Sequence, residues 1–431
     1  MTSLFSRRQI LRQAASVGGA SWLTWAANSL ARAQEKQPAA PARSLIVLWM
    51  QGGPSQLETF DPHPGAKIAG ETQAISTAVD GLQLAAGYEH LAEEANSVSF
   101  VRSVVSKEGD HERATYNVKT GFRPDPTLVH PAIGAVVCHQ LQDSLDIPRH
   151  VSILPRQWPA RGGYLGDQFD AFKINDPQQR IPDVQERVSK PRMQQRIKNL
   201  EKLAERFNRG RRRDLGAEKN LHEHMMQAAL RMMSSDQLNA FDVKQAPEEL
   251  RQEYGDTPFG RGCLAAARLV EAGVRCVEVT LGNWDTHINN HESHAELTKT
   301  LDPAFAALVR DLKRRELLDN TLVFCGGEFG RTPRINPAGG RDHWPHGFTI
   351  ALAGGGIQGG KVIGETAADP KLDVEKEKLV EQNVVDPRPV EDIHATILHA
   401  LGVDFSQMLD TPVGRPMIIS KGKVIEELLV G

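Results

Sequence analysis

The chain has 431 residues, of which 51 are Lys or Arg and 54 are Asp or Glu, so its formal net charge is -3. This near-neutral balance argues against a polybasic nucleic-acid-binding protein, and the length is ample for a large buried core. The four cysteines show no CxxC spacing and are too few to stabilise a chain of this length by disulfides. We expect them to be buried small hydrophobic side chains, with disulfides as the alternative outside the cytoplasm.

The first 33 residues contain the three parts of an export signal. Residues 6–12 (SRRQILR) resemble the twin-arginine motif, a mildly apolar stretch follows over 14–30, and Ala-Arg-Ala at 31–33 offers a small-x-small cleavage site. Glycine and polar residues interrupt the apolar stretch, so no stable membrane span is expected once the signal is removed. The pattern predicts a periplasmic or secreted protein with a linker over 34–43.

Short apolar runs alternate with helical patterns in the remaining domain, 44–431. The predicted strands are 44–50, 97–105, 150–154, 274–281, 321–326 and 348–354. The predicted helices are 127–142, 258–272, 294–316 and 390–401. This alternation indicates an α/β fold with a mainly parallel sheet flanked by helices. Ligands of such sheets bind at the carboxyl ends of the strands, where the polar motifs of this chain are concentrated.

One segment, about 183–250, interrupts that alternation. Apolar residues such as Met193, Ile197 and Leu200 recur every three or four positions in a basic stretch, which predicts an inserted helical hairpin. Its bases could bind an anionic polymer or a lipid. Acidic residues are interleaved with them, so a solvated helix face is the favoured interpretation.

The first two polar clusters follow the strands predicted at 44–50 and 97–105. The chain is expected to turn tightly at Gly52-Gly53-Pro54-Ser55, which would direct Ser55 at a ligand. The alternative is a proline-rich turn with no role in binding. In the second cluster, His111 and Arg113 lie where a helix is expected to begin. That position favours a bound anion, or simply a helix cap with a surface ion pair.

The third cluster follows the strand predicted at 274–281. Asp285 and His287 are two residues apart on an expected loop, from which both could ligate one metal ion. Carboxylate and imidazole ligands suit zinc, manganese or iron. A purely structural role is the alternative.

The fourth cluster is the densest in polar groups. It contains Glu328 and Arg331, followed by Arg341, Asp342 and His343. Arginines bind phosphate or sulfate oxygens bidentately, whereas acids and histidines serve as metal ligands or acid–base groups.

The order of these motifs resembles a twin-arginine-exported, sulfatase-like domain-of-unknown-function family of the alkaline phosphatase superfamily. The segments that carry the resemblance are 48–64, 110–121, 282–287, 326–345, 352–366 and 390–404. The resemblance implies an alkaline-phosphatase-like fold and a metal-assisted hydrolase of phosphate or sulfate esters, on a small molecule or a glycan.

The enzyme interpretation assigns three sets of site residues. The metal ligands are Asp285, His287, Asp342 and His343. The catalytic candidates are Ser55, Glu328 and His111. The anion-binding candidates are Arg113, Arg331 and Arg341.

Three departures from the superfamily pattern support a second interpretation. Gln51 follows the first strand where an Asp is usual, Gly109 stands at the nucleophile position, and Phe329 replaces a His. The alternative is therefore a non-catalytic superfamily member that binds an anionic ligand, a glycan or an envelope partner.

Overall fold

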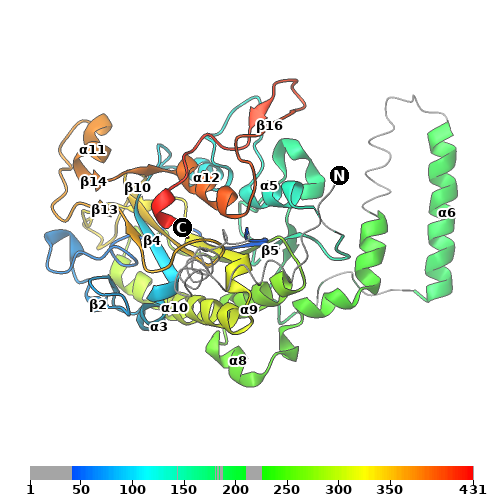
Figure 1. The fold of residues 1–431 in the computed structure, drawn as a ribbon, viewed down its shortest axis with the longest axis horizontal. Coiled ribbons are helices and arrows are strands. Elements are labelled where there is room, and N and C mark those ends of the chain that lie inside the picture. The colour runs from blue at the N-terminus through cyan, green and yellow to red at the C-terminus, as the bar shows by residue number, and fades with distance from the viewer. Residues whose placement is uncertain are drawn as a thin grey trace, which may run out of the picture. The chain divides into compact units, whose positions relative to one another are not determined.

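A mixed α/β domain with a central sheet is seen in the computed structural model of the chain (Figure 1). The structure describes residues 41–142, 144–179, 181, 184, 188–209 and 226–430. The expected signal peptide and residues 34–40 of the expected linker lie outside these ranges.

Within the described residues, the sheet has nine strands in the order β12-β4-β11-β8-β1-β7-β5-β6, and β15 pairs with β4. Their bounds are β1 Ser44–Met50, β4 Val98–Val105, β5 His150–Ile153, β6 Phe172–Ile174, β7 Cys276–Leu281, β8 Thr321–Gly326, β11 Phe348–Ala353, β12 Val362–Ile363 and β15 Arg388–Pro389. Every neighbouring pair is parallel except the two that involve β11. The predicted mainly parallel sheet is confirmed.

The alternating side chains of β1 divide the core between the two faces of the sheet. Ile46 and Leu48 belong to one buried cluster, whereas Leu45 and Val47 belong to the other. Helices α3 (Glu89–Glu93), α9 (Pro258–Glu271) and α10 (Asn290–Arg314) cover the first face. The second is covered by α4 (His111–Thr120), α5 (Ile133–Gln140) and α12 (Val390–Ala400). A strand buried on both faces must be apolar throughout, which explains the continuous run in β1.

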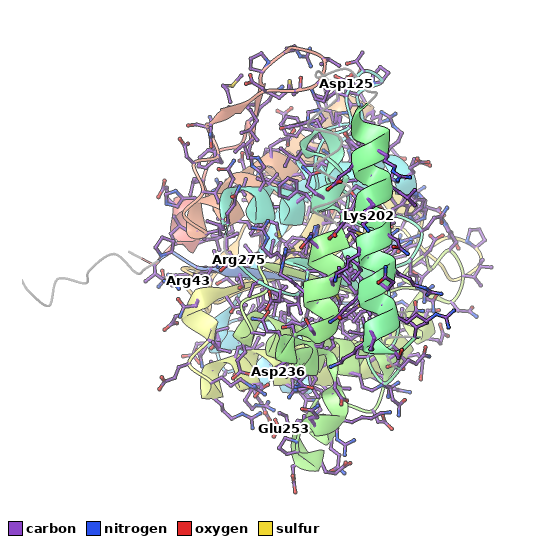
Figure 2. All side chains as sticks on the ribbon, turned by 90° about the vertical axis from the view of Figure 1, so that its right-hand side faces the viewer. Arg43, Asp125, Lys202, Asp236, Glu253 and Arg275 are labelled. Atoms are coloured by element: carbon purple, nitrogen blue, oxygen red, sulfur yellow. The ribbon has the colours of Figure 1, made fainter. Side chains whose placement is uncertain are left out.

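The two edges of the parallel strands differ. Arg43 and Arg275 lie together where β1 and β7 begin (Figure 2), and Arg275 Nη1 donates to the Arg43 carbonyl at 2.8 Å. At the opposite edge β1, β4, β7 and β8 end, and the antiparallel strand β11 begins. Loops from all five strands therefore meet at that edge, where four of them bring the polar clusters.

Most of the described residues in the segment around 183–250 are helical. Helix α6 spans Lys190–Arg209 and carries Lys202 (Figure 2), and residues 226–234 are also helical. Helix α8, Glu248–Glu253, follows. Residues 210–225, at the centre of the expected hairpin, lie outside the described residues.

The remaining elements are short. They are α11 Leu379–Asn383 and the paired strands β2 Ala74–Ser76 with β3 Gln83–Ala85, β9 Gly330–Arg331 with β10 His343–Trp344, β13 Glu365–Thr366 with β14 Val384–Val385, and β16 Met408–Leu409 with β17 Met417–Ile418. The four cysteines are buried. Among the described residues, none of the helices combines the length and apolar character needed to span a membrane.

Candidate metal centre

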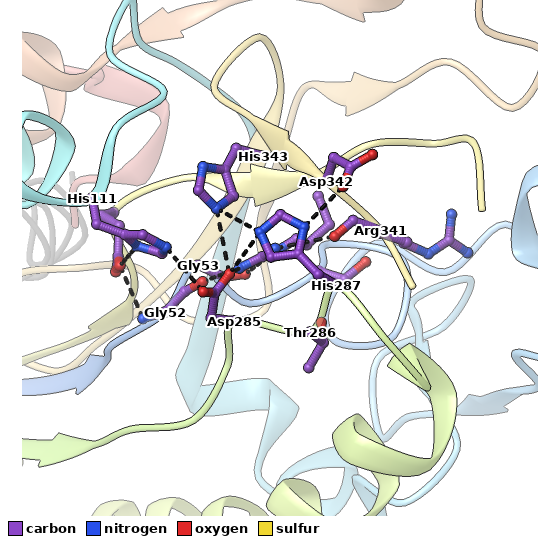
Figure 3. Close-up of polar contacts among 12 residues, drawn as sticks. Gly52, Gly53, His111, Asp285, Thr286, His287, Arg341, Asp342 and His343 are labelled. Atoms are coloured by element: carbon purple, nitrogen blue, oxygen red, sulfur yellow. Dashed lines mark hydrogen bonds and ion pairs between the residues drawn. The ribbon is translucent and has the colours of Figure 1, made fainter. Parts of the chain in front are cut away.

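The loops after β1 and β7 pack directly against each other. Gly52 and Gly53 have φ values of 123° and 77°, which favour glycine. A Cβ at Gly52 would lie 2.5 Å from the backbone nitrogen of Asp285, so only glycine allows this close approach. The tight turn thereby holds Asp285 beside the end of β1 (Figure 3).

His111 is the first residue of α4 and is held by Glu328. Its Nδ1 lies 2.8 Å from Glu328 Oε1, which also accepts a hydrogen bond from Gly52 N at 2.9 Å. Burial lowers the pKa of His111, but the bond and the charge of Glu328 outweigh burial and raise it. The carboxylate anchors a proton on Nδ1, which leaves the buried Nε2 without a hydrogen-bond partner and 3.3 Å from Asp285 Oδ2.

His343 and His287 are oriented in the same way by other acceptors. His343 Nδ1 lies 2.8 Å from the Gly109 carbonyl, and His287 Nδ1 lies 2.8 Å from Asp342 Oδ1. Because a carbonyl only accepts, His343 Nδ1 carries a proton, and the carboxylate favours the same tautomer in His287. The two Nε2 atoms then face each other at 3.1 Å.

Asp285 completes the cluster. Its Oδ1 lies 3.2 Å from His287 Nε2 and 3.3 Å from His343 Nε2, and it accepts a bond from Arg331 Nη2 at 2.6 Å. Burial raises the pKa of Asp285, but the hydrogen bond and charge of Arg331, with the neighbouring histidines, lower it to about 2. The group is thus an anion at neutral pH. One ligand atom from each of His111, Asp285 and His343 falls within 4.8 Å of the others (Figure 3).

Asp342 and Glu328 lie on the Nδ1 side of the imidazoles of His287 and His111, away from the converging Nε2 atoms. Asp342 contacts His287 Nδ1, and Glu328 contacts His111 Nδ1. Residues in such positions orient metal-binding histidines and raise their basicity. The structure therefore brings together Asp285, His287, Asp342 and His343 with two of the catalytic candidates, and it adds His111 to the possible ligands.

The third catalytic candidate, Ser55, is fully buried. Its backbone N donates to His294 Nε2 at 2.9 Å, and its hydroxyl has no exposed surface. A nucleophile must reach the substrate, so this placement does not support a nucleophilic role for Ser55.

The arginine candidates are bound to protein oxygens. Arg331 is fully buried and donates to the Gly53 carbonyl at 2.8 Å as well as to Asp285 and the Gly52 carbonyl. Arg341 is also fully buried, and its Nη2 lies 2.8 Å from Glu58 Oε1. Neither guanidinium is open to a ligand, so both serve here to join loops rather than to bind an anion.

Arg113 differs from the two buried arginines because it is exposed. Its Nε donates to Glu108 at 2.7 Å, as the cap-and-ion-pair alternative predicts. The N-cap Asp110 accepts from Arg113 N at 3.2 Å, which completes that cap.

Two residues near the cluster, Trp158 and Arg156, were not predicted because they lie on the loop after β5, which has no dense polar cluster in the sequence. The Trp158 ring stacks near His111, with centroids 6.3 Å apart and planes 14° apart. Arg156 Nη1 donates to Asn283 Oδ1 at 3.2 Å. The one feature of the sequence that could have indicated them is that this loop follows a strand predicted to be buried, at 150–154.

The comparisons identify a family. A family model described as "Protein of unknown function (DUF1501)" matches residues 42–429, and the chain belongs to that family. None of the curated proteins matches the chain.

Several solved structures are similar at low identity. The PsFucS1 sulfatase from Pseudoalteromonas sp. has 12% identity and a TM-score of 0.37, over 90% of this chain and 73% of that chain. The C-terminal periplasmic domain of EcEptC from Escherichia coli, in complex with Zn, has 9% identity and a TM-score of 0.39, over 92% of this chain and 94% of that chain. The phosphonate monoester hydrolase SpPMH from Silicibacter pomeroyi has 12% identity and a TM-score of 0.35, over 90% of this chain and 76% of that chain.

Proposed function

We propose that this protein is an exported, metal-dependent hydrolase of phosphate or sulfate esters. One observation carries the proposal: three imidazole Nε2 atoms converge beside an ionised carboxylate, while each Nδ1 is anchored by an acceptor. Export rests on the twin-arginine motif at residues 6–12.

The donor set fits a divalent cation. With their Nδ1 atoms anchored, His287 and His343 direct their Nε2 atoms at each other across 3.1 Å, an arrangement that a shared proton or a cation stabilises. The orphaned Nε2 of His111 adds a third nitrogen donor from the opposite side of Asp285. Imidazole and carboxylate donors favour zinc, manganese or iron over calcium.

His111, Asp285 and His343 would hold the ion, with His287 as a further ligand. A bound divalent cation supplies a Lewis acid that polarises an ester oxygen and acidifies water. Arg331 keeps the Asp285 carboxylate ionised and fixed, and Glu328 holds the proton of His111 on Nδ1. The half-exposed Asp285 leaves one side of the cluster open to substrate.

The alternative is a member that binds an anionic ligand, a glycan or an envelope partner without chemistry. The buried Ser55 and the glycine at position 109 favour it, because neither supplies a nucleophile to the cluster. The two functions differ in turnover rather than in ligand binding.

The test is metal titration of the mature protein with Zn²⁺, Mn²⁺ and Fe²⁺, followed by assays with aryl phosphate and aryl sulfate esters. We expect about one tightly bound ion for each chain and ester turnover that depends on it. Metal binding without turnover of either ester would favour the non-catalytic alternative. Absence of metal binding would contradict the proposed centre.

A further inference from the structure

We infer that Arg156 binds the phosphate or sulfate group of the ligand at the metal centre, an inference that rests on the proposed function. The sequence motifs predict that role for three other arginines, Arg113, Arg331 and Arg341. In the structure each of them is already paired with a carboxylate: Arg113 with Glu108, Arg331 with Asp285 and Arg341 with Glu58. An anion needs a guanidinium that is not already paired.

Arg156 meets this requirement. Its side chain is exposed, and the contact that it makes is with the neutral amide of Asn283, at 3.2 Å. In the part of the chain that the structure describes, no carboxylate lies within ion-pair distance of it. A free guanidinium on an exposed loop recognises tetrahedral oxyanions by paired N–H bonds.

The guanidinium is also held close to the metal loop. A Cβ at Gly282 would lie 2.5 Å from Arg156 Cζ, so the group lies directly on the backbone where β7 has just ended. Asn283, which holds it, has a φ of 78° and precedes Asp285 by two residues, a span of at most about 7 Å. Arg156 thus lies beside the loop that carries the central carboxylate.

The other end of the same loop is fixed on the opposite side of the cluster. Trp158 stacks near His111, and its carbonyl accepts a bond from Lys119 Nζ at 2.8 Å. Lys119 is buried and paired with Glu278 at 2.9 Å. The segment 156–158 is therefore anchored at both ends, which lowers the entropy that Arg156 loses when it binds an anion.

The experiment measures binding of inorganic phosphate and of sulfate by calorimetry, with metal-loaded and metal-free protein. Arg156→Gln should weaken anion binding about 10- to 100-fold, the loss expected for charged hydrogen bonds, and should leave the affinity for the metal alone unchanged. Arg156→Lys should recover part of the loss, since it restores the charge without the paired donors. Arg161→Gln, which changes an exposed arginine further along the same loop, is the matched control.

The outcomes separate this inference from the proposed function. If wild type binds metal and phosphate and Arg156→Gln binds both equally well, the inference is overturned while the metal centre stands. If wild type binds neither metal nor anion, both are overturned. If Arg156→Gln also loses the metal, the residue has a structural role and the inference fails.

Discussion

A buried core group and a partly exposed site group of histidines occupy neighbouring parts of this molecule and differ in how their ring nitrogens are used. In the core group, His294 Nδ1 lies 2.9 Å from the Asn290 carbonyl and its Nε2 accepts from Ser55 N, while His394 Nε2 lies 2.8 Å from the Val118 carbonyl. Burial lowers the pKa of both to about 4. These histidines are neutral parts of the packing.

In the site group, each Nδ1 is anchored but each Nε2 faces another donor or the Asp285 carboxylate. Backbone groups satisfy the core histidines and would be left unpaired without them, whereas the Nε2 atoms of the site histidines are directed at one another or at the Asp285 carboxylate. The partner of the second ring nitrogen distinguishes the two groups, and the site histidines are also more exposed than the buried core histidines.

The largest expected effect is loss of the metal on removing a ligand. His343→Ala should weaken metal binding by more than about 100-fold, beyond the range for residues that only orient ligands. His394→Gln should leave metal affinity unchanged, because this histidine belongs to the core group. Metal content after dialysis measures the effect of both substitutions. Equal metal affinity in wild type and His343→Ala would contradict the distinction between site and core histidines.

The core histidines should make the protein acid-sensitive. His394 has an unperturbed pKa of 6.5 and a folded pKa of about 4, so between these values the unfolded chain takes up a proton that the folded chain does not. Stability therefore falls as the pH drops from 6.5 towards 4, by about 3 kcal/mol for this one group.

Denaturant unfolding of wild type and His394→Gln across that pH window tests this prediction. The variant should lose less stability than wild type on acidification, because the glutamine does not titrate. Parallel curves for the two proteins would show that His394 is not held neutral by burial.

A smaller effect is expected at the anchor of His111. Glu328→Gln retains the shape of the side chain but removes the charge that holds the proton on Nδ1, so metal binding should weaken about 10- to 100-fold. The affinity measured by competition with a chelator checks this. An unchanged affinity would mean that Glu328 supports only the Gly52 turn.

The smallest effect is expected at Asp342. Its side chain is 58% exposed, so water can replace it as the acceptor for His287 Nδ1. Asp342→Asn should lower metal affinity by about 10-fold or less. A loss as large as that of His343→Ala would instead indicate that Asp342 binds the ion directly.

Much of the fold was predictable because a strand buried on both faces of a parallel sheet is a continuous apolar run. All six predicted strands correspond to strands of the sheet, including β1 at Ser44–Met50 and β8 at Thr321–Gly326. The three-residue strand β6, Phe172–Ile174, was missed because it is too short to produce a pattern. The antiparallel direction of β11 was also not predictable, since burial and composition are the same for either direction.

By itself, the sequence determined which loops would bring polar clusters together, because acids, histidines and arginines follow buried strands that must end at one edge. Tertiary structure alone decided the state of each group. Arg331 and Asp285 are 46 positions apart in the chain, yet their pairing turns an expected anion-binding arginine into a buried support. The orientation of each imidazole likewise depends on an acceptor from another segment, which no local pattern records.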